Sequence, residues 1–325
     1  MTLGRVLARG RLLAFAGLLL IGCFGTGRAQ AHPADDGDPW VTLTVNGLDR
    51  HYLLHVPPTR VLASAAEGRP LPLVIVLHGA AGDARSTADM TGFSPLADQA
   101  GFIAVYPEGT SIGVEPPRQT WNAGFCCGAA VRNHVDDVAF LAALIDHLAA
   151  DQPVDRQRIY LTGLSNGAML AYRFAAEHPE TVAAIAPVAG TIGGTAGTGQ
   201  PPITIERPHR PVPVLIIHGM MDGYVLYRGG VSPNLGIPGR FNVSVDDAVR
   251  FWAAADGCAR PPRSGATADG RVLFLDYARC RGRAEVRLVA LAQGPHEWPV
   301  AIERPDGGTE PTAALIWRFF RQHLR

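Results

Sequence analysis

The sequence alternates short apolar runs with longer stretches of helical periodicity, and this alternation constrains the fold more than any other feature. The runs PLVIVL at 72–77, FIAVY at 102–106 and VPVLII at 212–217 are almost wholly apolar. Strands have this composition when helices cover both faces of a parallel sheet. From 136 to 148, apolar residues instead recur every three or four positions, which indicates a helix. Strands that alternate with helices predict an α/β fold, with a mostly parallel central sheet and helices on both faces.

The remaining elements follow from the same patterns. Further strands are expected at 159–162, 182–188 and 286–291, and further helices at 165–178, 244–255 and 312–323. Residues 40–45 and 51–56 are predicted to form a hairpin through the Asn46-Gly47 turn, at an antiparallel edge of the sheet. The segments 189–210 and 224–241 are rich in Gly, Thr and Pro, and we expect them to be surface loops.

Residues 1–31 have the pattern of a secretion signal. Arginines supply a positive start, an apolar stretch follows from 12 to 24, and Ala29-Gln30-Ala31 fits the small-x-small cleavage pattern. The apolar stretch is too short for a comfortable transmembrane helix. We therefore expect a mature chain of residues 32–325, which is predicted to form one domain because it shows neither an internal repeat nor an interdomain linker.

A second cleavage pattern overlaps the first. Leu20-Ile21-Gly22-Cys23 is similar to a bacterial lipoprotein box, which would leave Cys23 as a lipidated N-terminus. Phe24 is a less usual residue at the next position, so Ala29-Gln30-Ala31 is the favoured site. Either route exports the protein.

Four cysteines remain after either cleavage, and cysteines in an exported protein favour disulfides. Cys258 and Cys280 flank a short predicted strand and are the natural pair. Three alternatives stay open for Cys126 and Cys127: a bond between these neighbours, two buried thiols, or another pairing among the four. None of these cysteines has the spacing of a metal site.

Chemically active residues follow four of the predicted strands. In chain order they are the glycine-rich turn His78-Gly79-Ala80, then Ser165, Asp222 and His296. Because catalysis in α/β folds collects at the carboxyl ends of the strands, we expect these residues to lie close together.

A serine, a histidine and a carboxylate together allow nucleophilic catalysis. A serine hydroxyl is a poor nucleophile until a base takes its proton, and histidine titrates near neutral pH. A buried carboxylate fixes the tautomer of the imidazole and stabilises the imidazolium. Gly163 and Gly167 permit a sharp strand–turn–helix that lifts the Ser165 hydroxyl above the sheet, and the amides of Asn166 and Ala80 would then donate to a developing oxyanion.

The Ser, Asp, His order and the turn Gly163-Leu164-Ser165-Asn166-Gly167 resemble the α/β-hydrolase fold. More narrowly, the chain resembles the esterase family that includes polyhydroxybutyrate depolymerases, feruloyl esterases and acetylxylan esterases. The segments that carry this resemblance are 77–79, 121–128, 135–138, the Ser165 turn, 218–222 and 296–299. The resemblance covers about 42–324. It implies that Ser165 is the nucleophile, His296 the base and Asp222 the orienting acid.

Each of these residues also has a structural interpretation. Ser165 alone is a good helix cap, Asp222 a common turn residue and His296 a possible core histidine. Their order after successive strands favours catalysis. Asp246 and Asp247 are alternative acids, but they stand where a helix begins and are expected to cap it, as are Asp136 and Asp137.

Two histidines and two tryptophans lie in or near the same motifs. His78 and His218 are expected to pack beside their glycines rather than to act as bases. For Trp121 and Trp298 two interpretations stay open: core residues, or an aromatic platform that binds the acyl or sugar part of a substrate.

Together these patterns predict an exported serine carboxylesterase that acts through an acyl-enzyme. The substrates implied by the resemblance are polyhydroxybutyrate-type oligomers, or feruloyl and acetyl esters of plant polysaccharide. No cofactor is required, and the zinc motif H-E-x-x-H is incomplete because Val300 stands where it needs histidine. The formal net charge is zero and no basic block suggests nucleic acid, and no protein partner is predicted. The alternatives are a serine peptidase of the same fold and a non-catalytic cell-envelope binding protein.

Overall fold

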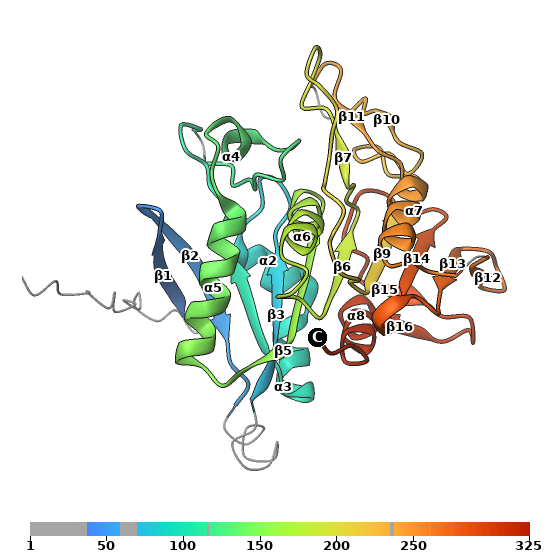
Figure 1. Cartoon of the computed structure of the whole chain (residues 1–325), viewed down its shortest axis with the longest axis horizontal. Helices are drawn as coiled ribbons and strands as arrows, with labels where there is room; N and C mark the ends of the chain where they lie inside the picture. The colour runs from blue at the N-terminus through green and yellow to red at the C-terminus, as the bar shows by residue number, and fades with distance from the viewer. Residues whose placement is uncertain (1–37, 59–69, 116, 235–236, 260) are drawn as a thin grey trace, which may run out of the picture.

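The computed structural model describes residues 38–58, 70–115, 117–234, 237–259 and 261–325 (Figure 1). The predicted signal peptide and Cys23 lie outside these residues. Within them, no helix is long and apolar enough to span a bilayer.

A ten-stranded sheet organises the chain, in the order β1-β2-β4-β3-β5-β6-β9-β14-β13-β12. Its six central strands, β4 to β14 in that order, pair in parallel, and the outer strands pair antiparallel. The strands are β1 (Trp40–Val45), β2 (Leu48–His55), β3 (Leu71–Leu77), β4 (Ile103–Pro107), β5 (Val154–Leu164), β6 (Ala184–Val188), β9 (Val214–Gly219), β12 (Arg263–Ala266), β13 (Val272–Tyr277) and β14 (Val286–Leu291). The predicted α/β fold with a mostly parallel sheet is confirmed.

Helices cover both faces of this sheet, as expected. Alternate residues of β3 enter two separate cores: Leu73 and Ile75 pack with α5, α6 and α7, whereas Val74 and Val76 pack with α2, α3 and α8. This burial on both faces explains why the strand is apolar at every position. The helices are α2 (Ala84–Thr91), α3 (Phe93–Ala100), α4 (Gly128–Arg132), α5 (Asp137–Asp151), α6 (Asn166–Glu177), α7 (Val245–Ala255) and α8 (Thr312–Phe320), with a short 3₁₀ turn at Arg281–Arg283.

The predicted hairpin forms one edge of the sheet. Asn46 and Gly47 have φ angles of 51° and 77°, both in the left-handed region that a tight two-residue turn requires. The pairing of β1 with β2 runs from Trp40 opposite Leu53 to Val45 opposite Leu48. The second strand therefore begins three residues earlier than predicted.

The expectation that 189–210 and 224–241 are plain surface loops is wrong. They carry the two-residue strands β7 (Gly193–Gly194), β8 (Ile203–Thr204) and β10 (Gly230–Val231), and β11 (Phe241–Asn242) completes a second sheet in the order β10-β11-β7-β8. Figure 1 shows this small sheet standing beyond the central one, near the end of β6. Strands of two residues have no detectable sequence period, which is why the pattern missed them. The chain also forms a separate ribbon of β15 (Ala301–Glu303) and β16 (Thr309–Pro311).

Disulfides join both cysteine pairs. Cys258 is bonded to Cys280, as predicted, which links the end of α7 to the segment before β14. Cys126 is bonded to Cys127 across a cis peptide bond. Among the alternatives left open for these neighbours, the structure shows the bond between them.

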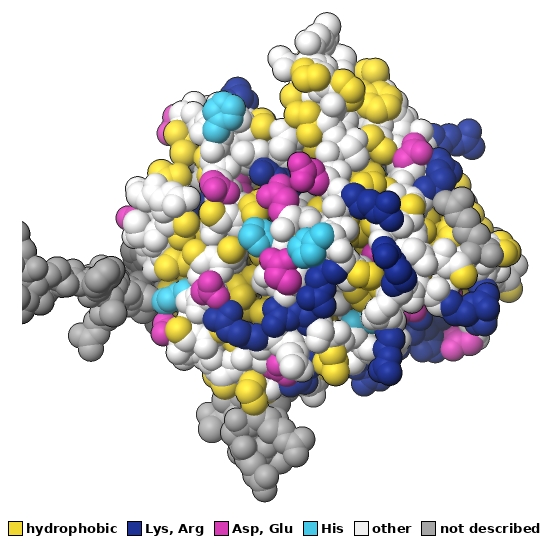
Figure 2. Space-filling view, viewed as in Figure 1, with side chains coloured by type: hydrophobic (Ala, Val, Ile, Leu, Met, Phe, Trp, Pro, Cys, Tyr) yellow, Lys and Arg dark blue, Asp and Glu magenta, His cyan; other side chains and the backbone are white. Residues whose placement is uncertain are grey.

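Charged side chains are mixed over the surface that Figure 2 displays, with basic groups gathered over its lower and right-hand parts. A pocket of about 440 Å³ lies at the amino ends of β6, β9 and β14, and its lining includes Arg210, Arg279 and Arg283. This is the opposite edge of the sheet from the strand ends that carry Ser165, Asp222 and His296.

Asp256 is a buried carboxyl at the end of α7, with no exposed surface. Its Oδ1 accepts a hydrogen bond from the Val212 amide at 3.0 Å, and no described residue bonds to its Oδ2. Burial raises the pKa of Asp256 to about 7. The folded protein therefore holds a proton here that the unfolded chain, with a pKa of about 3.9, has lost above pH 4.

We predict that the contribution of Asp256 to the free energy of unfolding falls as the pH rises from 4 to 7, because the pKa of Asp256 is raised in the folded state. Stability falls over that range because the unfolded chain binds fewer protons than the folded protein, and the contribution levels off above pH 7. Asp256→Asn removes the titration, so its melting temperature should gain on the native protein between pH 4 and pH 7.5. Asp246→Asn, at an exposed site, is the control. A difference between Asp256→Asn and native that does not change with pH would contradict the assignment.

Candidate active site

Ser165 lies at the sharp turn between β5 and α6. Its φ and ψ angles are 55° and −114°, a backbone conformation that non-glycine residues rarely adopt. The flanking glycines are required because the turn touches the end of β3. A Cβ on Gly163 would lie 2.7 Å from the Leu77 carbonyl oxygen, and one on Gly167 would lie 2.5 Å from the carbonyl oxygens of both Leu77 and His78.

A chain of hydrogen bonds joins the three predicted residues. The Ser165 Oγ lies 2.9 Å from Nε2 of His296, and Nδ1 of His296 lies 2.7 Å from Oδ2 of Asp222. These side chains come from the ends of β5, β14 and β9, and 131 residues separate the serine from the histidine. The geometry is that of a nucleophile, a base and an orienting carboxylate.

The Asp222 carboxylate is buried but well bonded. Its Oδ1 accepts the amides of Tyr224 and Val225, both at 2.8 Å, and its Oδ2 accepts Nδ1 of His296 at 2.7 Å and lies 3.2 Å from Nε2 of His218. Burial alone would raise the pKa of Asp222, but the bonds from His218 and His296 outweigh it and hold the pKa far below the usual range. The carboxylate therefore stays ionised, which keeps the proton of His296 on Nδ1 and leaves Nε2 free to face the serine.

The two other histidines of the motifs are structural, as expected. Nε2 of His78 accepts the Gly109 amide at 2.9 Å, its Nδ1 donates to the Gly79 carbonyl at 2.7 Å, and burial lowers its pKa to about 4. His78 is therefore neutral and braces its own turn. His218 donates from Nε2 to the Val225 carbonyl at 2.8 Å besides approaching Asp222, a contact with the acid that the sequence did not reveal.

The backbone amides predicted to receive an oxyanion, those of Ala80 and Asn166, belong to the turn at Gly79 and to the start of α6. A Cβ built on Gly79 lies 3.6 Å from Cβ of Ser165, so the His78-Gly79-Ala80 turn runs directly beside the nucleophile. The amides of Ala80 and Asn166 bond to no described residue. The side chain of Asn166 is occupied elsewhere: Oδ1 accepts the Trp121 amide at 2.7 Å and Nδ2 donates to the Trp121 carbonyl at 3.0 Å.

Of the two interpretations left open for Trp121 and Trp298, the structure shows the core one for both. Trp121 is fully buried, and its indole N–H donates to the His78 carbonyl at 2.9 Å. Trp298 is 5% exposed and packs edge-on against Phe93. The aromatic ring beside the histidine is instead Tyr224, 43% exposed, with its centroid 5.2 Å from that of His296.

A buried ion pair anchors the Trp121 segment, which is Trp121 with the following Asn122. Asp137 bonds to Arg50 at 2.7 Å through Oδ1 and accepts the Asn122 amide at 2.7 Å through Oδ2. The expectation that Asp137 caps a helix is therefore wrong, whereas Asp136 is the N-cap and accepts the Ala139 amide at 3.0 Å. Capping and burial look alike in sequence because both place an aspartate before a helix.

Asp246 and Asp247, the alternative acids, lie in the first turn of α7, and Ser244 provides the side-chain cap. The hydroxyl of Ser244 bonds to both the amide and the carboxylate of Asp247. Neither aspartate bonds to His296, whose carboxylate partner is Asp222.

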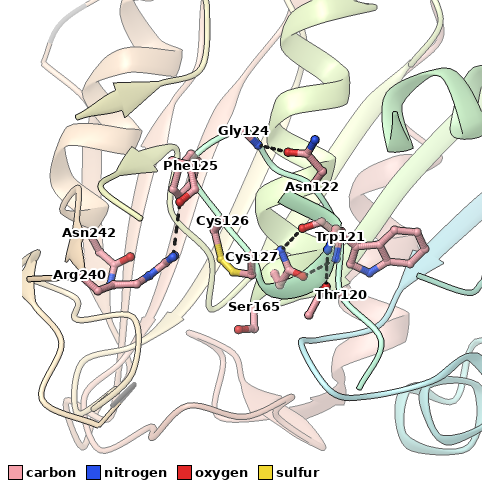
Figure 3. Close-up of a disulfide and its surroundings, with 12 residues drawn as sticks. Thr120, Trp121, Asn122, Gly124, Phe125, Cys126, Cys127, Ser165, Arg240 and Asn242 are labelled. Atoms are coloured by element: carbon pink, nitrogen blue, oxygen red, sulfur yellow. Dashed lines mark hydrogen bonds between the residues drawn. A yellow bond between two sulfur atoms is a disulfide. The ribbon is translucent and has the colours of Figure 1, made fainter. Parts of the chain in front are cut away.

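The Cys126–Cys127 disulfide lies near Ser165. Figure 3 shows it close to Ser165, between the Trp121 segment and Arg240. Nδ2 of Asn166 lies 3.9 Å from Sγ of Cys126, so the residue next to the nucleophile also contacts the disulfide.

The family model of esterase PHB depolymerases matches residues 51–247, more than half of the chain. The chain belongs to this family. A protein of Nocardia uniformis subsp. tsuyamanensis named as an esterase, NocK, is 32% identical over 280 residues, which are 83% of this chain and 74% of NocK. Feruloyl esterase B of Piromyces equi is 28% identical over 226 residues, 69% of this chain and 39% of that protein.

A solved structure has the same architecture. The acetyl xylan esterase from Aspergillus awamori superposes with a TM-score of 0.55 at 16% identity, covering 91% of this chain and 99% of that one. The predicted α/β-hydrolase fold is therefore confirmed. As a member of the PHB depolymerase esterases the chain is a carboxylic ester hydrolase, which decides against the peptidase and the non-catalytic alternatives.

We predict that Gly167→Ala damages this site severely. The new Cβ meets two backbone carbonyls at the end of β3, and backbone cannot move aside as a flexible side chain can. The expected loss of unfolding free energy is about 1–3 kcal/mol, measured by urea denaturation, together with most of the ester hydrolysis. Gly265→Ala is the matched control, because nothing lies within 4 Å of its Cβ position. Equal behaviour of the two variants would contradict the close-approach argument.

Proposed function

We propose that this chain is an exported serine esterase that cleaves carboxylic esters through an acyl-enzyme. The hydrogen-bonded series Ser165, His296 and Asp222 supports the proposal most directly. His296 takes the serine proton as Oγ attacks the ester carbonyl, and returns it to the departing alcohol. Water then attacks the acyl-enzyme with His296 again as base, which releases the acid and restores the serine.

The backbone amides of Ala80 and Asn166 donate hydrogen bonds to the negative charge that develops on the carbonyl oxygen. The Asn166 amide opens α6, where the helix dipole favours negative charge, and the Ala80 amide lies in the turn beside Ser165. Donors fixed before the reaction need no reorganisation during it, which is why such sites lower the barrier strongly. Apart from the attacking water, every proposed step uses groups of the chain itself.

The proposed substrates are polyhydroxybutyrate-type oligomers, or feruloyl and acetyl esters of plant polysaccharide. The names of the family and of the feruloyl esterase relative support this range. The exposed Tyr224 ring beside His296 offers an apolar surface to an acyl or aryl group at the reacting centre.

Export rests on the sequence of residues 1–31, with cleavage after Ala31 or, as a lipoprotein, before Cys23. The two disulfides suit an oxidising compartment, as expected outside the cytoplasm. Residues 32–325 would then act as one catalytic domain.

The Ser165→Ala variant tests the nucleophile. The purified native protein and the variant are compared on p-nitrophenyl acetate, methyl ferulate and soluble 3-hydroxybutyrate oligomers. Loss of about 10⁶-fold in kcat is expected if the three residues act as a unit. Ser264→Ala, an exposed serine of β12, is the matched control and should keep full activity. Ester turnover that survives in Ser165→Ala would refute the assignment, and the ranking of the three esters selects the substrate class.

A further inference from the structure

Arg240 is a buried cation without a carboxylate. Arg240 is only 3% exposed. Within the described part of the chain, its guanidinium forms no ion pair. The one hydrogen bond that the Arg240 side chain makes to the described residues is long, from Nη1 to the Phe125 carbonyl oxygen at 3.4 Å. Burial lowers the pKa of Arg240 to about 10, so the guanidinium still carries its charge at neutral pH.

Arg50 shows how the same fold satisfies a buried arginine. It is also 3% exposed, but its Nη2 bonds to the Asp137 carboxylate at 2.7 Å and to the Glu108 carbonyl at 3.1 Å. Its guanidinium also lies 3.9 Å above the Phe140 ring. The Nε atoms of both arginines lack a partner among the described residues, so the difference between them is the carboxylate. A buried charge without a counter-charge is costly to keep, which makes Arg240 a candidate for recognising a ligand.

The position of Arg240 connects it to the catalytic site. It precedes β11 in the small sheet, and its contact with Phe125 places it against the loop of the Cys126–Cys127 disulfide. Figure 3 shows Arg240 on one side of that disulfide and Ser165 below it. On β11 itself, Asn242 donates from Nδ2 to the Tyr224 carbonyl at 3.3 Å, and the Tyr224 ring lies tilted against His296.

Asn242 is a second unsatisfied polar residue in this region. It has no exposed surface, and no described residue donates to its Oδ1. Buried polar atoms in folded proteins are normally paired, so two orphaned groups two residues apart indicate a place completed by something else. A ligand that completes this place must bring a negative charge to the Arg240 guanidinium and a hydrogen-bond donor to the Asn242 Oδ1, which is an acceptor.

We propose that Arg240 binds a free carboxylate of the substrate, so that the esterase prefers esters that carry a carboxylate over neutral ones. A guanidinium can hold a carboxylate through two parallel hydrogen bonds, which fixes orientation as well as charge. Short hydroxyalkanoate oligomers have this chemistry, because each oligomer ends in a free acid. This inference rests on the proposed esterase function and specifies its substrate class.

Two pairs of esters test the preference in the native protein. The first pair, 4-nitrophenyl hydrogen adipate and 4-nitrophenyl hexanoate, differs in a carboxylate on the acyl side. The second, 3-acetoxybutyrate and 3-acetoxybutanamide, differs in a carboxylate on the alcohol side. We expect the charged ester to have the higher kcat/KM in at least one pair. No preference in either pair would overturn the proposal.

The variant Arg240→Met assigns the preference to this residue. The charged-to-neutral ratio of kcat/KM should fall by about ten- to a hundred-fold in the preferred pair, the range expected for hydrogen bonds to a charged group. Arg250→Met, which removes an exposed arginine, should leave the ratio unchanged. Equal loss on both members of each pair in Arg240→Met would mean a purely structural role and would overturn the proposal.

A measurement on the native protein covers the case in which Arg240→Met does not fold. Adipate should inhibit hydrolysis of p-nitrophenyl acetate competitively and at least tenfold more strongly than adipamide, and Arg240→Lys should weaken this difference. Equal inhibition by the two compounds would also overturn the proposal. Failure of the esterase function itself is distinguishable, because p-nitrophenyl acetate, which carries no carboxylate, would then not be cleaved in a Ser165-dependent way.

Discussion

Parallel pairing of the central strands is the constraint on which the rest of this structure depends. The ends of β3, β5, β9 and β14 meet at one edge of the sheet because these strands run in the same direction. Residues as far apart in the sequence as His78 and His296 are thereby brought within hydrogen-bond distance or van der Waals contact of the Ser165 turn. The turn can approach β3 only because Gly163 and Gly167 lack side chains.

A second layer of contacts holds the reacting groups from outside. Asp137 and Arg50 anchor the Trp121 segment, and the backbone of Trp121 bonds to the side chain of Asn166. The side chain of Asn166 is therefore held away from Ser165, and its backbone amide remains next to that residue. On the other side, the amides after Asp222 and the ring of His218 hold the carboxylate that orients His296. The positions of the groups around Ser165 are therefore fixed by hydrogen bonds and ion pairs that do not involve Ser165 itself.

The sequence predicted those parts of the molecule that depend on local pattern. Apolar runs located the central strands, and the order of Ser165, Asp222 and His296 after successive strands identified the three residues that the structure joins. The sequence did not predict the short helices α2 to α4 or the two-residue strands, because these elements are too short to show a hydrophobic period.

Burial and long-range contacts could not be predicted in the same way. Trp121 and Trp298 are core residues, Tyr224 takes the place beside the histidine, and Asp137 is an ion-pair partner rather than a cap. Each of these outcomes depends on segments that fold together from distant parts of the chain. The charge state of Asp222 likewise follows from two backbone amides and two imidazole rings that only the fold brings together.

In the proposed mechanism, Ser165 carries the acyl group between two chemical steps. Rapid mixing of the native protein with p-nitrophenyl acetate, followed by acid quenching and peptide mass spectrometry, tests this directly. When deacylation is the slower step, we expect a burst of nitrophenol close to one equivalent per protein and an acetyl group on the peptide that contains Ser165. An acetyl group found on another residue instead of Ser165 would contradict this mechanism.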